Sequence, residues 1–203
     1  FENSAYASFR PMHGIFGTWD DHDYGGNDMG KEMPRKRERR TAFLDFLDAS
    51  KPNNMPPMQL LPDSREGLYY SVDFGTPPQQ VKVIFLDTRW NRDPHCIPSL
   101  ATQVPMGAGL SCLMRWTVAG ILAPFLRLFP YTKKRCMEAS LLGQDQWNWL
   151  QKELESSQAQ LHVLVSSIQV LTTNPVVESW GHFESERTRL LRMLLTNTTT
   201  NTR

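Results

Sequence analysis

Hydrophobic and polar positions follow two different periods along the chain, which is typical of a mixed α/β protein. Alternating or continuous apolar runs predict strands near 14–19, 68–74, 81–87 and 161–170. Apolar residues spaced three and four positions apart predict helices near 34–49, 143–155 and 183–195. The turn-forming residues at 75–78 separate the second strand from the third, so these two are expected to form a hairpin. The last strand is long and mostly apolar and is expected to lie in the middle of a sheet.

Three stretches interrupt this pattern. Residues 50–66 are rich in proline and asparagine and are expected to form a loop. Residues 110–131 are rich in Leu, Trp, Phe and Met, but the longest run without charge, 116–126, is shorter than the about 20 apolar residues that cross a bilayer. No membrane-spanning helix is therefore predicted; an interfacial anchor, a capping helix and sequence foreign to the mature protein all remain open. The Thr/Asn-rich tail at 196–203 is predicted to be disordered.

Length and charge narrow the class of protein. A chain of 203 residues with 40% hydrophobic and 21% charged residues suits one soluble domain with a sizeable core. The net charge of +1 gives no reason to expect nucleic acid. The basic run at 35–40 is interpreted as the solvated face of an amphipathic helix beside an anion site, with a nuclear signal or a nucleic-acid patch as the alternative. The three cysteines lack metal-ligand spacing and predict neither a disulfide framework nor a compartment. The chain starts at Phe1 without a secretory leader, so its start is expected to be internal.

The strongest chemical signal is the acidic cluster Asp20, Asp21, His22 and Asp23, which follows an apolar run and precedes two glycines, Asn27 and Asp28. In α/β proteins, sites lie where strands end. Neighbouring ionised carboxylates repel one another, so a cation is their natural partner. Carboxylate and imidazole ligands suit Fe, Mn, Zn or Ca. A solvated acidic turn with one surface histidine is the simpler alternative.

A second signal follows the strand near 81–87, which ends in Asp87, Thr88 and Arg89, with Arg92 close behind. Either arginine can clamp a phosphate group with two hydrogen bonds. Alternatively, the aspartate and an arginine form a pair that braces the end of the strand. Both interpretations stay open.

These motifs together resemble a known family. The run Trp19-Asp20-Asp21-His22-Asp23-Tyr24-Gly25, followed by Asn27-Asp28, is similar to the signature of PhoD-like phosphatases in the metallophosphatase superfamily. Leu86-Asp87-Thr88-Arg89, the Leu-Gly-x-x-Gln-x-x-Trp-Leu run at 142–150 and the Trp-Gly pair at 180–181 resemble it as well. The resemblance covers most of residues 10–99 and 140–195 and implies part of a sandwich of two β-sheets flanked by helices. Residues 1–195 would form this partial domain, with an atypical apolar insertion at about 100–136.

The resemblance also implies a function and a site. It implies a metal-dependent phosphatase acting on phosphomonoesters or phosphodiesters, in a family whose members are often secreted or in the endomembrane system. Asp21 would be the first metal ligand and Asp20 the second, while His22 and Arg89 would contact the phosphoryl group or leaving group. The supporting set would be Asp23, Asn27, Asp28, Asp87 and Arg92.

Two points qualify this assignment. Adjacent residues that leave a strand point to opposite sides, so Asp21 and Asp23 are expected to share one face and Asp20 and His22 the other, unless the glycine turn begins early. The Gly-Asp ligand pair of the family would lie before Phe1, and its later Ser-Gly-Asp-x-His motif is replaced by the Thr/Asn tail. The alternative is therefore a catalytically incomplete remnant that acts as a binding or membrane-associated protein. Membrane contact through residues 110–131 fits that alternative but is not predicted.

Overall fold

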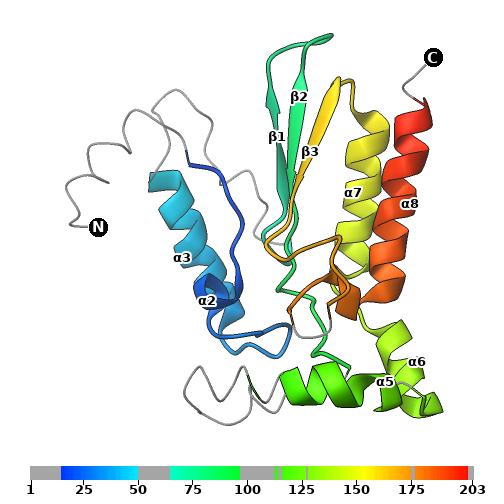
Figure 1. Ribbon diagram of the computed structural model, residues 1–203. Coiled ribbons are helices and arrows are strands. Elements are labelled where there is room, and N and C mark those ends of the chain that lie inside the picture. The colour runs from blue at the N-terminus through cyan, green and yellow to red at the C-terminus, as the bar shows by residue number, and fades with distance from the viewer. Residues whose placement is uncertain are drawn as a thin grey trace.

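A computed structural model describes residues 15–49, 65–96, 113, 116–126, 128–174 and 177–200. Its sheet contains β1 (Tyr70–Phe74), β2 (Val81–Phe85) and β3 (Leu161–Val165) in the order β1-β2-β3. β1 pairs antiparallel with β2, and β3 pairs parallel with β2. Helices lie on both sides of this sheet (Figure 1). The predicted α/β class and the predicted hairpin are therefore confirmed.

The third predicted strand differs from its prediction in place and length. β3 is an edge strand of the described sheet, and the central strand is β2. β3 ends at Val165 rather than near 170, because the Ser166 hydroxyl donates a hydrogen bond to the carbonyl of Ile168 and turns the chain away. The exposure of Leu161 and Val163 agrees with an edge position. The continuous apolar pattern therefore predicted the strand correctly but not its position in the sheet.

The segment at 15–19 is extended but does not join the sheet, so the strand predicted near 14–19 is wrong for the described residues. The Tyr70 hydroxyl accepts a hydrogen bond from the Gly17 amide (3.0 Å) and donates one to the Gly17 carbonyl (2.9 Å). One side chain thus supplies the two hydrogen bonds that a neighbouring strand would supply. Burial raises the pKa of Tyr70 to about 12, so the hydroxyl keeps its proton and both bonds. Gly14 lies outside the described residues.

The predicted helices are confirmed with small shifts of their ends. They are α3 (Lys36–Ala49), α7 (Gln144–Ser156) and α8 (Glu184–Thr200), with a single short turn, α2 (Asp21–Tyr24), before α3. α3 covers one side of the sheet, and α7 and α8 cover the other (Figure 1). α8 continues to Thr200, so helix extends through much of the tail predicted to be disordered. Residues 201–203 and most of the predicted loop at 50–66 lie outside the described residues.

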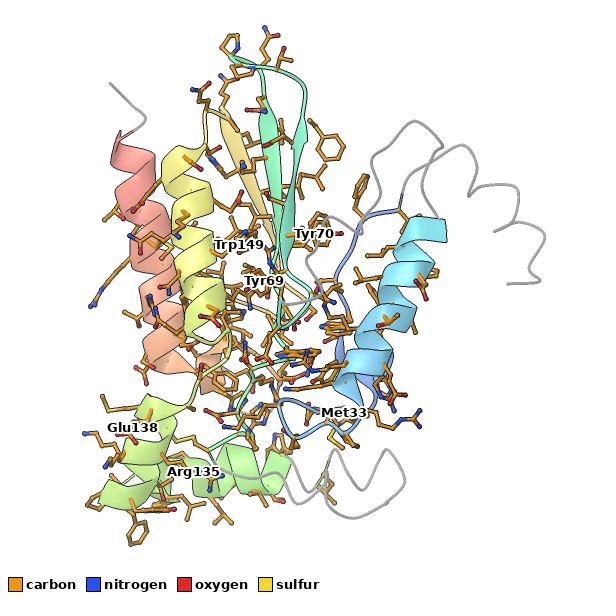
Figure 2. The ribbon with its side chains drawn as sticks, turned by 180° about the vertical axis from the view of Figure 1, so that it is seen from behind. Met33, Tyr69, Tyr70, Arg135, Glu138 and Trp149 are labelled. Atoms are coloured by element: carbon orange, nitrogen blue, oxygen red, sulfur yellow. A yellow bond between two sulfur atoms is a disulfide. The ribbon has the colours of Figure 1, made fainter. Side chains whose placement is uncertain are left out.

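Successive side chains of β2 point to opposite faces of the sheet, so the hydrophobic core has two parts, one on each face. Ile84 packs with Trp147 and Leu150 of α7, whereas Phe85 packs on the α3 side with Leu47. Tyr69 and Trp149 close the space between the hairpin and α7, with ring centroids 4.8 Å apart (Figure 2). β2 is therefore covered on both faces at Ile84 and Phe85, which holds its carboxyl end in place, whereas Phe74 of β1 and Leu161 and Val163 of β3 stay exposed.

The basic run at 35–40 is less solvated than expected. Arg40 is buried and donates through Nε to the carbonyl of Gly67 (2.8 Å). Lys36 donates through Nζ to the carbonyl of Trp90 (3.1 Å). The interpretation of a purely solvated face is wrong for these two residues, because their long side chains reach the backbone that enters and leaves the hairpin.

The apolar insertion forms a layer of short helices beyond the ends of the strands (Figure 1). These are η3 (Trp116–Leu122), α5 (Ala123–Leu126) and α6 (Pro130–Glu138). A disulfide between Cys96 and Cys136 joins α6 to the segment that follows β2. The cysteine pattern did not predict this bond. Within the described ranges, the helices are all too short or too polar to cross a lipid bilayer.

Candidate metal centre

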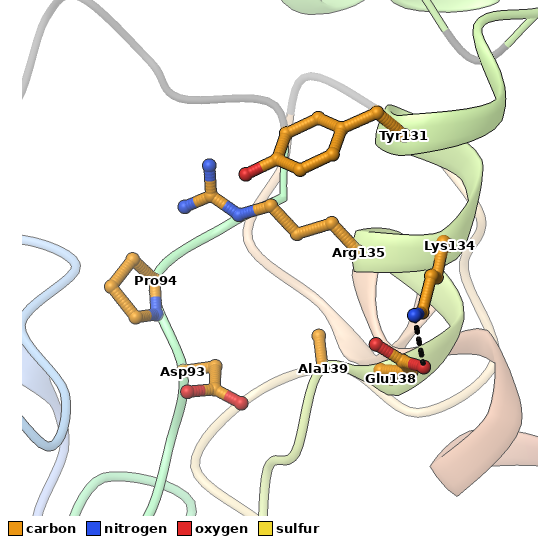
Figure 3. Close-up of a pocket in the computed structure, with 7 residues that line it drawn as sticks. All are labelled: Asp93, Pro94, Tyr131, Lys134, Arg135, Glu138 and Ala139. Atoms are coloured by element: carbon orange, nitrogen blue, oxygen red, sulfur yellow. Dashed lines mark ion pairs between the residues drawn. The ribbon is translucent and has the colours of Figure 1, made fainter.

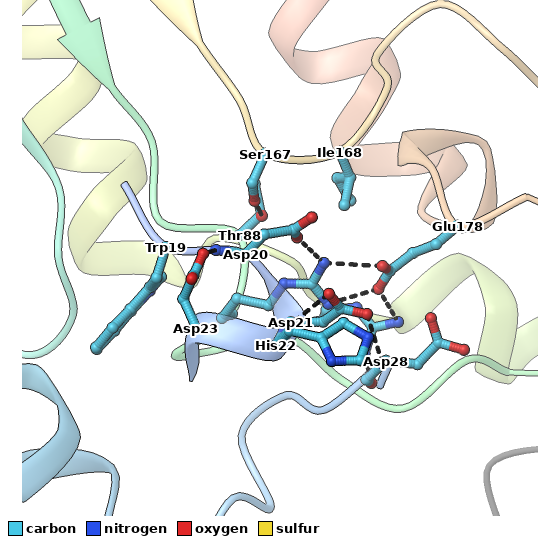
Figure 4. Close-up of polar contacts among 12 residues, drawn as sticks. Trp19, Asp20, Asp21, His22, Asp23, Asp28, Thr88, Ser167, Ile168 and Glu178 are labelled. Atoms are coloured by element: carbon cyan, nitrogen blue, oxygen red, sulfur yellow. Dashed lines mark hydrogen bonds and ion pairs between the residues drawn. The ribbon is translucent and has the colours of Figure 1, made fainter. Parts of the chain in front are cut away.

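The predicted site residues gather at the carboxyl ends of the two parallel strands (Figure 4). Thr88 follows β2 and Ser167 follows β3, and their hydroxyl oxygens are 2.6 Å apart. The short helix α2 lies opposite these strand ends. This is the position where α/β folds place ligands, because the loops that follow the strands converge there.

The acidic motif folds into one helical turn instead of a continued strand. Asp20 precedes the turn, and its amide donates to the Asp23 carboxylate (3.1 Å). The Asp21 carboxylate instead accepts the amides of His22 (2.8 Å) and Asp28 (3.2 Å). The strand-like alternation predicted for these residues is therefore wrong. Because the chain becomes helical directly after Asp20, the Asp23 carboxylate accepts a hydrogen bond at the start of the turn and the Asp21 carboxylate accepts one from Asp28, beyond its end.

A carboxylate from a distant loop completes the cluster. Oxygen atoms of Asp21, Asp28 and Glu178 lie within 4.8 Å of one another, a spacing that can hold a metal ion. Asp28 is largely buried and adopts a left-handed backbone conformation (φ 56°), which aspartate tolerates better than most residues. Glu178 was missed by sequence reasoning. Its only local signal is its position just before the Trp180-Gly181 pair.

Two buried arginines hold Glu178. Both terminal nitrogens of Arg89 contact its carboxylate (2.7 and 2.8 Å), and one of them also pairs with Asp20. Arg92 contacts the same carboxylate (2.7 Å) and donates to the carbonyl of Asp28. Burial lowers the pKa of Arg89, but hydrogen bonds and the charges of Glu178 and Asp20 outweigh it, so this pKa is raised. Burial dominates at Arg92, whose pKa is lowered. Both guanidiniums therefore bind carboxylates of the chain itself.

The three-carboxylate group offers oxygen ligands to a cation. Asp21, Asp28 and Glu178 each supply a carboxylate oxygen, and these oxygens lie within 4.8 Å of one another. Hard divalent cations prefer carboxylate oxygens. The residues present therefore fit such a cation in ligand type and spacing.

The other predicted residues lie around this centre. Asp20 belongs to the ion pair with Arg89 and not to the three-carboxylate group. The side chains of His22, Asp23 and Asn27 are exposed. Within the described part of the chain, no hydrogen bond is found for the His22 and Asn27 side chains, which leaves both available to a ligand.

Asp87 stabilises the loop that follows β2 through hydrogen bonds of its buried side chain. Its fully buried carboxylate accepts hydrogen bonds from the Trp19 indole and from the amides of Leu68, Arg89 and Trp90, at 2.6 to 3.0 Å. The Gln146 side chain from α7 bonds both the amide and the carbonyl of Asp87 (2.8 Å each). These bonds fix the direction in which Arg89 leaves the strand. They also give Gln146 of the motif at 142–150 a structural role.

The loop that carries Glu178 is held by two stacked histidines. His95 and His182 stack with centroids 4.2 Å apart, and the Nε2 atom of His182 lies 3.0 Å from the Val177 carbonyl. Arg92 can only donate, so His95 accepts its hydrogen bond through Nε2 (2.7 Å) and is neutral there. Burial and the charge of Arg92 hold the pKa of His95 well below its ordinary value.

Comparison with known proteins places this arrangement in context. The sequence model described as PhoD-like phosphatase matches residues 3–202. A solved structure titled "Structure of PhoD" is 22% identical with a TM-score of 0.48, over 89% of this chain and 31% of that one. The chain thus spans about a third of the length of that solved protein. No match is found among curated proteins.

Proposed function

The chain belongs to the PhoD-like phosphatase family, and from this premise we propose that it takes part in metal-dependent hydrolysis of phosphoesters. The observation that carries the proposal is the convergence of Asp21, Asp28 and Glu178. Their oxygens come within 4.8 Å although the first and last lie far apart in sequence. Carboxylates so close to one another repel one another when ionised, and a metal ion would reduce this repulsion in addition to the arginines that contact Glu178.

The proposed ligand set revises the one expected from the resemblance. Asp21 remains the first ligand, whereas Asp28 and Glu178 replace Asp20 beside it. Asp20 instead positions Arg89. An all-oxygen set suits calcium or manganese better than zinc, and iron(III) shares the preference for oxygen. When bound, such a cation supplies charge neutralisation for a phosphoryl group and lowers the pKa of a coordinated water.

The side chains around the cluster have separate roles in this proposal. Arg89 and Arg92 orient Glu178 through their ion pairs with its carboxylate. His22 is exposed at the start of α2, where its imidazole can donate a proton to a leaving oxygen. Asp23 is bonded to the amide of Asp20 and holds the turn that presents Asp21 and His22. The substrate class is a phosphomonoester or a phosphodiester.

A second candidate function is a binding protein that keeps the fold without turnover. The observation that favours it is that Asp20, Arg89, Arg92 and Glu178 are already paired with one another. Such a network can persist without a metal ion. The two candidates differ in whether bound metal is accompanied by hydrolysis.

The test begins with the purified chain, its metal content by mass spectrometry and its titration with Ca²⁺, Mn²⁺, Zn²⁺ and Fe³⁺. Hydrolysis of p-nitrophenyl phosphate and of bis(p-nitrophenyl) phosphate is measured beside each titration. Metal binding with hydrolysis supports the phosphatase, and metal binding without hydrolysis supports the binding protein.

Substitution of the ligands assigns the site. Asp21→Ala is expected to abolish metal binding and Asp28→Ala to weaken it, because Asp21 is also the residue that organises the turn. Asp145→Ala, an exposed aspartate in the first turn of α7, is the matched control. Full metal occupancy in the Asp21→Ala protein would show that the motif is structural in this chain.

A further inference from the structure

The described part of the chain concentrates its exposed apolar side chains in one place. Nine of the fifteen large hydrophobic residues that are exposed fall between positions 113 and 137, on η3, α5 and α6 and at Leu113, Leu128 and Phe129. We call these the apolar end surface: Leu113, Trp116, Ile121, Leu122, Phe125, Leu128, Phe129, Tyr131 and Met137. Single exposed apolar residues are ordinary, but a contiguous group marks a surface that contacts something else.

The position of this surface suits a flat partner. α5 and α6 form a layer beyond the ends of the strands, at one end of the molecule (Figure 1). No residue of α6 is buried. Contact with a plane at this end would leave the sheet and its flanking helices undisturbed.

The charges beside the apolar side chains are basic. α6 carries Lys133, Lys134 and Arg135 against a single acid, Glu138. Lys134 is 3.8 Å from Glu138, and both side chains are well exposed, so this ion pair neutralises little. For Arg135, no ion pair is found within the described residues. The surface therefore combines apolar side chains with an uncompensated positive edge.

A cavity of about 360 Å³ opens at this edge, between α6 and the segment that follows β2. The Arg135 guanidinium lies across it, between Tyr131 and Pro94 (Figure 3). Asp93, on the opposite wall, is already paired with Lys31. The cavity thus offers a cationic group beside an aromatic ring, which suits an anionic headgroup.

We propose that the apolar end surface binds the interface of a bilayer that contains anionic lipid. A helical layer too short to span, with Trp, Phe and Leu beside lysine and arginine, is the composition of segments that lie in the plane of a membrane. Trp116 and Tyr131 carry the amphipathic rings found at the level of headgroups. The basic edge favours anionic lipid over the surface of a second copy, which would bring like charge against it. None of the nine residues of this surface belongs to the candidate metal centre.

The charge part of the test uses vesicle co-sedimentation. The whole chain is expected to sediment with vesicles of phosphatidylcholine and phosphatidylserine, and far less with phosphatidylcholine alone. Each lysine near such a surface contributes about fivefold in affinity, so Lys133→Ala with Lys134→Ala should weaken binding roughly 30-fold. Lys152→Ala, an exposed lysine of α7, is the control and should bind as the unmodified chain does.

The apolar part uses two leucines of similar exposure. Leu128, at 78% exposed, lies in the apolar end surface, and Leu171, at 75%, lies outside it. Leu128→Ser should weaken vesicle binding about tenfold, whereas Leu171→Ser should leave it unchanged. Thermal unfolding of each variant without vesicles separates lost binding from lost folding.

Tryptophan fluorescence locates the contact. Trp116 is the one exposed tryptophan among the six, all of which the structure describes. Brominated lipid is expected to quench the tryptophan fluorescence of the chain. Trp116→Phe should remove most of this quenching while the variant still binds vesicles.

Two results would overturn the proposal. Equal binding to neutral and anionic vesicles would remove the role of the basic edge. Self-association that Leu128→Ser abolishes, without any vesicle binding, would assign the surface to a second copy of the chain.

Discussion

Replacing Glu178 by glutamine removes the carboxylate that, among the described residues, contacts both buried arginines. Arg89 and Arg92 are almost completely buried, and the Glu178 side chain is only 12% exposed. Removing one partner of a buried ion pair costs about 3–5 kcal/mol, because the other charge stays out of water without compensation. Glutamine keeps one oxygen as an acceptor, and Asp20 still faces Arg89. We therefore expect the lower end, about 3 kcal/mol of unfolding free energy.

The assay is urea denaturation at neutral pH, with thermal unfolding beside it. For a chain of this size, about 3 kcal/mol corresponds to a fall in Tm of roughly 6–12 °C. Glu184→Gln makes the same chemical change at an exposed position on α8 and should leave the midpoint nearly unchanged. A double-mutant cycle with Arg92→Gln should give a coupling energy of roughly 1–3 kcal/mol between the two positions.

The same variant reports on the metal centre. Calcium or manganese that binds the native cluster should raise the stability of the unmodified chain, and less so that of Glu178→Gln, which loses one of three carboxylates. A stability loss no larger than that of Glu184→Gln would refute the buried ion-pair network. If Glu178→Gln loses about 3 kcal/mol of stability but is stabilised by the metal ion as much as the unmodified chain is, the ion-pair network stands and Glu178 is not a metal ligand.

Three further substitutions test the parts that position the site. Gly30→Ala should destabilise the chain by about 2 kcal/mol or more in urea denaturation, because the new Cβ would lie 2.4 Å from the Arg92 carbonyl oxygen. Tyr70→Phe should cost about 2 kcal/mol by losing both hydrogen bonds to Gly17, whereas Tyr69→Phe, the control, should cost little. His95 has a lowered folded-state pKa, so the unfolded chain takes up a proton below about pH 6.5 and the folded chain does not. The free energy of unfolding should therefore decrease as the pH is lowered below that value. His95→Gln should make this decrease smaller, which urea midpoints measured from about pH 5 to 7.5 would show.

The sequence by itself determined the class of fold and most of its elements. The hairpin at 70–85 follows from two strand-like runs around a glycine and proline turn. The three long helices follow from apolar residues at helical spacing. Both signals are local, since they record which face of one segment is buried. The acidic motif lies beside the ends of β2 and β3, although the strand that was expected to lead into it, near 14–19, does not join the sheet.

Only the tertiary structure decided how those elements combine. β3 lies at the edge because it pairs with β2 alone among the described strands, and nothing in its own residues states that pairing. The Cys96–Cys136 disulfide depends on where α6 is placed, which the spacing of the cysteines does not encode. The segment at 15–19, predicted to pair as a strand, is instead held by two hydrogen bonds between Gly17 and the Tyr70 side chain.

The candidate metal centre also combines residues that the sequence pointed to with residues that only the tertiary structure brings together. Asp21 was expected from the motif, but its separation from Asp20 and Asp23 depends on the single helical turn that starts after Asp20. Glu178 joins the cluster through contacts with Arg89 and Arg92, roughly ninety residues earlier in the chain. A sequence pattern records the environment of one segment, whereas the charge balance of a site depends on side chains that only packing brings together.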